Sequence, residues 1–131
     1  MGIKDTQYRD IMFSYDQTRM KNKRILDARF EKLYKELPEL KDIHDTLIEL
    51  SLNQARLELL NPKQAAENLE AYRKQKDKLS KRKTEILLEN NYTKDYLSPL
   101  YTCADCKDTG YINGTPCHCL KQTRLEILYE N

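Results

Sequence analysis

The chain has 131 residues, a net charge of +2, and a composition that is 34% charged and 39% hydrophobic with only three glycines. This length allows one domain or one elongated module, and the small apolar fraction excludes a large round core. The composition is typical of long solvated helices that each carry a narrow apolar stripe. No apolar run is long enough to span a membrane, and the first ten residues lack an apolar signal core. We therefore expect a cytoplasmic, mainly α protein that has no membrane partner.

Pro38 and Pro62 divide the first two thirds of the chain into three predicted helices. Proline disfavours helix at the residue before it but suits the first turn of the next helix. The first helix is predicted from about Asp5 to Glu36, with two apolar stripes separated by the basic segment 19–24. This helix either continues through the basic segment, where other residues leave it partly uncovered, or breaks near residues 16–18.

The second and third predicted helices have apolar residues at alternating spacings of three and four. The second, from about Glu39 to Leu60, has a stripe of Leu40, Ile43, Leu47, Leu50 and Gln54, widened by Ile48, Ala55 and Leu59. The third, from about Pro62 to Asn90, has a heptad seam of Ala65, Leu69, Tyr72, Lys76, Leu79, Lys83 and Ile86. Two helices joined at one proline, with facing stripes, predict an antiparallel hairpin over residues 39–90. The first helix either packs on this hairpin or extends away from it.

All four cysteines of the chain lie within the segment 103–119, in the order CADC-KDTGYINGTP-CHC. A thiolate pair two residues apart, followed by a second close pair, is the spacing with which a turn and a hairpin surround one metal ion. Asn113-Gly114 predicts a tight turn between two short strands, and Gly110 allows a tight turn after the first pair of cysteines. The residues predicted to bind structural Zn²⁺ are Cys103, Cys106, Cys117 and Cys119. A final helix is predicted to start at the last of them.

Other interpretations of the cysteines remain open at this point. An iron–sulfur cluster, a redox-active pair and disulfides all use cysteine, although neither a strand–helix–strand context nor an export signal favours the last two. His118 lies between two cysteines and is an alternative ligand. Four thiolates would saturate a zinc ion and leave no open position for catalysis, and the chain has no GxxxxGK[ST] phosphate loop. We therefore predict a chain that is not itself an enzyme, with no catalytic residues.

Residues 101–122, YTCADCKDTGYINGTPCHCLKQ, resemble the zinc module of bacterial replicative helicase loaders, the DnaC/DnaI-like ATP-binding proteins, in their clostridial form. That pattern is approximately Tyr-x-Cys-x-x-Cys-x-Asp-Thr-Gly, a short hairpin, Cys-x-Cys and Lys-Gln. The segments 28–40 and 87–101 are also similar to the helical region of that family. The matching positions are Tyr101, Cys103, Cys106, Asp108, Thr109, Gly110, Cys117, Cys119, Lys121 and Gln122.

The resemblance implies an amino-terminal domain that binds the hexameric replicative helicase and helps to load it onto single-stranded DNA. In such loaders an AAA+ ATPase domain follows, so we expect ATP to bind only in a further domain and this chain to be a piece of a longer protein. The expected organisation is a helical, coiled-coil-like region over 1–91 and a zinc module with the start of a linker helix over 92–131. The alternatives are a zinc-containing module that binds nucleic acid, with single-stranded DNA as partner, and a coiled-coil scaffold that self-associates through the heptads of 65–86.

Overall fold

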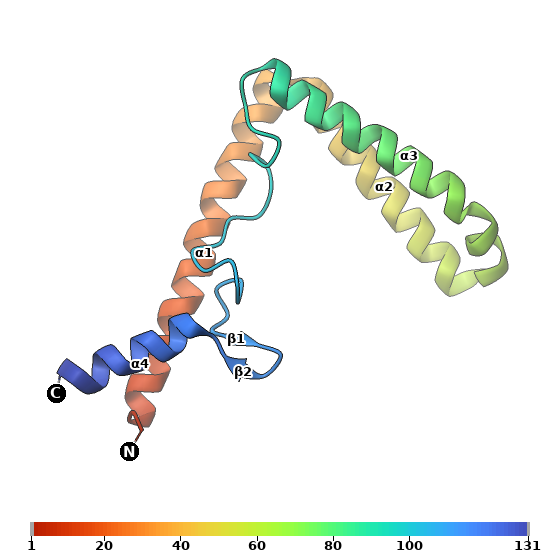
Figure 1. Ribbon diagram of the computed structural model, residues 1–131. Helices are drawn as coiled ribbons and strands as arrows, with labels where there is room; N and C mark the ends of the chain where they lie inside the picture. Colours follow the sequence, from red (N-terminus) through yellow and green to blue (C-terminus); the bar gives the residue numbers. More distant parts are fainter. Residues whose placement is uncertain (1, 131) are drawn as a thin grey trace. The chain divides into compact units, whose positions relative to one another are not determined.

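The computed structural model describes residues 2–130, which form helices and one small antiparallel sheet (Figure 1). The elements in chain order are α1 (Asp5–Glu36), α2 (Pro38–Leu60), α3 (Pro62–Glu89), β1 (Tyr111–Ile112), β2 (Thr115–Pro116) and α4 (His118–Glu130). The mainly α fold with a helical hairpin, a small β-hairpin and a carboxy-terminal helix is therefore confirmed. No helix within the described residues is both long and apolar enough to cross a membrane.

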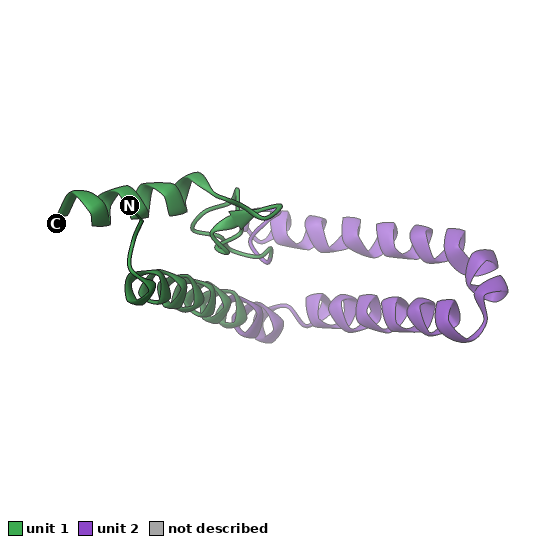
Figure 2. Cartoon of the chain, turned by 90° about the horizontal axis from the view of Figure 1, so that it is seen from below, with its two compact units in different colours: residues 1–28, 98–131 green, residues 29–97 purple. Residues whose placement is uncertain are grey.

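The chain divides into two compact units, shown in different colours in Figure 2. Unit 1 contains residues 1–28 and 98–131, and unit 2 contains residues 29–97. The expected boundary at residue 91 divides the chain into two successive segments. The compact units are groups of residues in contact, so unit 1 combines an early segment with the cysteine segment. The first 28 residues share a unit with the cysteine segment because side chains of α1 bind that segment directly, as described below.

Unit 2 consists of the α2–α3 hairpin, the last turns of α1 and the segment that follows α3. Its buried core brings together residues from all of these parts, namely Leu33, Leu40, Ile43, Ile86, Leu87 and Leu97. Leu33 and Leu87 are fully buried, so α1 packs on the base of the hairpin through its carboxy-terminal turns. His44 of α2 packs against aromatic residues of α1. The centroid of its ring lies 5.7 Å from that of Phe30 and 5.5 Å from that of Tyr34.

The tight turn of the hairpin is fixed by Asn61 and Gln54. Asn61 caps α3, because its side-chain oxygen accepts a hydrogen bond from the Gln64 amide at 3.2 Å. Gln54, the last residue of the predicted α2 stripe, is buried, and its amide donates to the Ala65 carbonyl at 3.0 Å. At the open end of the hairpin, the Arg82 guanidinium contacts both carboxylate oxygens of Glu39 at 2.9 and 3.1 Å. The hydrogen bonds from Arg82 lower the pKa of the Glu39 carboxyl.

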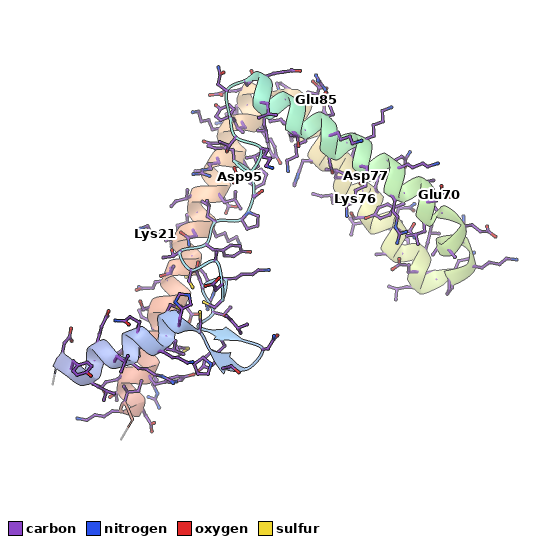
Figure 3. The ribbon with its side chains drawn as sticks, viewed as in Figure 1. Lys21, Glu70, Lys76, Asp77, Glu85 and Asp95 are labelled. Atoms are coloured by element: carbon purple, nitrogen blue, oxygen red, sulfur yellow. The ribbon has the colours of Figure 1, made fainter. Side chains whose placement is uncertain are left out.

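The predicted α2 stripe is correct in one part and wrong in another. Its main positions face α3 and are buried or half-buried, but the three residues predicted to widen it, Ile48, Ala55 and Leu59, are exposed. The lysines in the α3 seam also differ from each other. Lys76 is exposed, whereas Lys83 is half-buried, and burial lowers the pKa of its amine. Figure 3 shows the charged side chains of Glu70, Lys76, Asp77 and Glu85 along α3.

In unit 1, α1 continues without a break through residues 16–18. Its basic segment 19–24 is exposed except at Asn22, as the prediction of a partly uncovered helix expected. Ile11 of α1 and Leu120 of α4 are buried there, together with Cys106 and Cys117. The two strands pair in the register Tyr111↔Pro116 and Ile112↔Thr115, as a hairpin closed by Asn113 and Gly114. Both turn residues have positive φ, as a two-residue hairpin turn of type I′ requires.

Candidate metal centre

The four cysteines converge in unit 1, with their sulfur atoms within 4.8 Å of one another. The Sγ atoms of Cys103 and Cys117 lie 3.8 Å apart, and those of Cys106 and Cys119 lie 3.6 Å apart. A disulfide requires about 2.0 Å between its sulfurs, so both pairs are free thiols. Four sulfurs around a tetrahedral ion with metal–sulfur bonds of about 2.3 Å would stand about 3.8 Å apart. The cysteines therefore fit a tetrahedral metal ion.

The loop after the first cysteine pair is folded tightly, which brings its amides towards the sulfurs. Lys107, Asp108 and Gly110 have φ values of 55°, 60° and 86°. The Gly110 amide donates to the Cys106 sulfur at 3.3 Å, and the Gly110 carbonyl accepts from the Cys117 amide at 2.8 Å. One residue thus connects the two halves of the cysteine cluster.

Gly110 is also the position where a larger residue would not fit. A Cβ atom placed there would stand 3.1 Å from Cε2 of Tyr15, in addition to the strain that its positive φ imposes on other residues. Tyr15 is therefore packed directly against the turn that follows Cys106.

Tyr15 of α1 forms a polar contact with the cluster itself. Its hydroxyl lies 2.9 Å from the sulfur of Cys119, and the tyrosine is the natural donor to a thiolate. Burial and this hydrogen bond raise the pKa of Tyr15 well above its usual range, so the hydroxyl keeps its proton at all physiological pH values. A permanent O–H donor beside Cys119 favours the charged form of that sulfur, which is the form that binds metal.

The thiols differ in how readily they lose a proton in the absence of metal. Burial raises the pKa of the Cys106 thiol, but the Gly110 amide and the neighbouring thiols outweigh it, and its pKa falls to about 7. Burial raises the pKa of Cys119 to about 12, with a further contribution from the Cys106 thiol. Because an ion binds the thiolate form, ion binding must displace the proton of Cys119.

Asp108 connects the cysteine segment to α1 and is almost completely buried, with 2% of its surface exposed. Its carboxylate accepts hydrogen bonds from the amides of Thr102 and Cys103 at 3.0 and 2.7 Å, and from the Asn22 side chain at 3.0 Å. Its backbone carbonyl accepts from the guanidinium of Arg19 at 2.5 Å. The basic segment of α1 thus holds the loop that carries the first cysteine pair.

Asp108→Asn is expected to weaken metal binding by roughly 10- to 100-fold. The NH2 group of the new side chain would point at one or more of the three groups that donate hydrogen bonds to the Asp108 carboxylate, and those bonds would be lost. The dissociation constant of the chain for Zn²⁺, measured by chelator competition, checks this. Asp27→Asn, an exposed position on α1, is the matched control and should leave the constant unchanged. Equal affinity of the Asp108 variant and the control would show that the carboxylate does not organise the site.

His118 and Asp105 form a second, exposed group beside the cysteines. Nε2 of His118 lies 2.7 Å from a carboxylate oxygen of Asp105 and 3.9 Å from the sulfur of Cys103. Cys103, Asp105 and His118 are therefore also close enough to share an ion. The fully sulfur-lined cluster has the more buried donors, and α4 begins at His118, one residue earlier than the predicted start at Cys119.

Comparison of the chain with models of protein families, with curated proteins and with solved structures gives no significant match. The site therefore stands on its own geometry. Sequence reasoning identified the four cysteines and Gly110, but it identified neither Tyr15 as a partner of Cys119 nor Arg19 and Asn22 as partners of Asp108. Tyr15 is 104 residues from Cys119, and no local spacing connects the two. Asp108 was the local sequence feature that could have indicated such partners, because it is an acidic residue next to a predicted turn.

Proposed function

We propose that this chain is the helicase-interaction domain of a DNA replication helicase loader, held in shape by structural Zn²⁺. The observation that carries the proposal is the cysteine cluster, because the loader-like segment 101–122 supplies all four sulfurs and the buried Asp108. The resemblance rests on the sequence pattern of residues 101–122. The convergence of its cysteines supports the interpretation that the pattern is a metal-binding module.

Zinc is the ion that this donor set favours. Four thiolates in a tetrahedron bind zinc or iron, and zinc is the usual ion of small structural sites with four cysteine ligands. A zinc ion saturated by four negative sulfurs is a poor Lewis acid and has no position for a substrate. Its role here would be to fix the loop 103–110, the β-hairpin and the start of α4 in one place.

The helices supply surfaces on which a protein partner can dock. Several large apolar side chains are exposed on α1, α2 and α4, for example Phe13 at 61%, Leu60 at 78% and Tyr129 at 85%. Exposed apolar residues on amphipathic helices are the anchors of helix-in-groove recognition. In this proposal the exposed apolar side chains of the helices contact the helicase, and the metal centre holds α1 and α4 together within unit 1.

The immobilised chain is expected to bind the hexameric replicative helicase of its own organism at micromolar concentrations, measured by biolayer interferometry. A hexameric ring ATPase with another function serves as the control and should not bind. The same chain without zinc should bind the helicase more weakly, because it loses the contacts that unit 1 makes with the helicase. Absence of saturable helicase binding by the zinc-loaded chain would refute the proposal.

A second candidate function, binding of single-stranded nucleic acid, is favoured by one observation. Tyr101, two residues before Cys103, is 44% exposed, and Lys107 and Lys121 are exposed nearby in sequence. An exposed aromatic ring among cations is the arrangement on which bases stack. Single-stranded DNA in place of the helicase in the same measurement tests this function, and salt-sensitive binding lost in Tyr101→Ala would support it.

A further inference from the structure

α2 carries a second apolar stripe that the fold of unit 2 does not use. We define the outer stripe of α2 as Ile48, Leu52, Ala55 and Leu59, which follow one another at spacings of four, three and four. Ile48, Leu52 and Leu59 are 45%, 60% and 84% exposed, and Ala55 is exposed as well. At 100° per residue this stripe is centred roughly 130° around the helix axis from the buried stripe. α3 therefore leaves it uncovered.

The spacing of the outer stripe is that of a coiled-coil seam. Ile48 and Ala55 occupy d positions and Leu52 and Leu59 occupy a positions of a heptad repeat. The other heptad seam of the hairpin, on α3, faces α2 of the same chain, since Ala65 accepts the hydrogen bond from buried Gln54. An intermolecular helix pair would therefore form on α2 through the outer stripe.

The charges that flank the outer stripe indicate which helix fits it. Glu49 and Arg56 occupy e positions, and Ser51 and Glu58 occupy g positions. Within residues 2–130, none of the ion pairs involves Glu49 or Arg56. Both side chains are thus available for a partner of opposite charge.

Two copies of α2 in antiparallel orientation match in both shape and charge. Leu52 then faces Ala55 of the second copy, and Ile48 faces Leu59. In antiparallel coiled coils e positions meet e positions, so Glu49 meets Arg56 twice, while Ser51 meets Glu58. A parallel pair would instead place Ser51 against Arg56 and Glu49 against His44, whose ring packs on Phe30 and Tyr34. The antiparallel arrangement alone pairs opposite charges.

We propose that the chain associates with a second copy of itself through the outer stripe of α2, paired antiparallel about a twofold axis between Leu52 and Ala55. The contact is self-complementary, as a twofold interface must be. The seam spans about one and a half heptads, so the dimer is expected to be weak and to form in the micromolar range. This inference does not depend on the proposed helicase contact.

Sedimentation velocity of the zinc-loaded chain over a range of concentrations tests the proposal. The unmodified chain should pass from monomer to dimer as concentration rises, and Leu52→Glu should weaken dimerisation by at least about tenfold, because each copy loses a buried leucine. Leu88→Glu is the matched control, since Leu88 is exposed on α3 to nearly the same extent, at 58%. It should dimerise as the unmodified chain does.

A charge exchange tests the orientation. Glu49→Arg alone and Arg56→Glu alone should each weaken the dimer by roughly two- to tenfold, and the double variant should restore it. A chain that stays monomeric at the highest concentration overturns the proposal, as does equal weakening by Leu52→Glu and Leu88→Glu. Failure of the double variant to recover overturns the antiparallel pairing. A monomeric chain whose Leu52→Glu variant loses helicase binding would assign the stripe to the helicase instead.

Discussion

Cys106→Ser is expected to unfold residues 101–120 and to leave the α2–α3 hairpin folded. Structural zinc supplies on the order of 10–16 kcal/mol to a small site, and loss of one buried thiolate removes most of that stabilisation. The strands of unit 1 are two residues each, and the segment has few buried apolar side chains to replace the metal. Unit 2 has its own apolar core and contains none of the four cysteines.

Limited proteolysis and hydrogen exchange, read segment by segment, measure this effect. Residues 101–120 should become protease-sensitive and exchange quickly, while amides of α2 and α3 keep their protection. Ala104→Ser is the matched control, because it places the same hydroxyl in the same turn at an exposed position. Unchanged resistance near the site in Cys106→Ser would show that the metal does not hold this segment together.

Leu87→Ala is expected to destabilise unit 2 by about 2–5 kcal/mol, the usual cost of truncating a fully buried leucine. Leu87 has no exposed surface and packs with Leu33, Leu40 and Ile86 in the core. The hairpin has little further apolar core to compensate for such a cavity. Metal binding should be retained, because the cysteines and their partners belong to unit 1.

Urea denaturation followed by helical circular dichroism, with zinc content measured in parallel, checks this expectation. The neighbouring residue supplies the control, because Leu88 is 58% exposed. Leu88→Ala should change the free energy of unfolding by no more than about 0.5 kcal/mol. Similar losses of unfolding free energy in both variants would mean that Leu87 is not a core residue.

The α2–α3 hairpin could be predicted because its signals are local. Prolines mark the helix starts, Asn61 supplies the cap, and the alternating spacing places Leu40 and Gln54 on one face. The same periodicity identified the buried stripe but wrongly joined Ile48, Ala55 and Leu59 to it, since these residues also have helical spacing. Burial depends on where α3 lies, and that is a property of the fold.

The candidate site shows the same division. Cysteine spacing and Gly110 indicated the metal ligands, because the ligands and the turns lie within one short segment. The contacts of Tyr15, Arg19 and Asn22 join residues more than 80 positions apart. Such contacts arise from tertiary packing of α1, which leaves no trace in the local sequence of either partner.

Unit 1 is assembled from both ends of the chain, and this has a consequence for the order of folding. A ribosome completes residues 29–97, the whole of unit 2, before any cysteine has been made. The amino-terminal turns of α1 must then wait for Cys119, 104 positions after Tyr15. A hairpin that has already folded shortens the flexible loop between them and lowers the entropy cost of closing it. Metal capture is therefore expected to follow the folding of unit 2, as a closure that joins the amino-terminal turns of α1 to the cysteine segment.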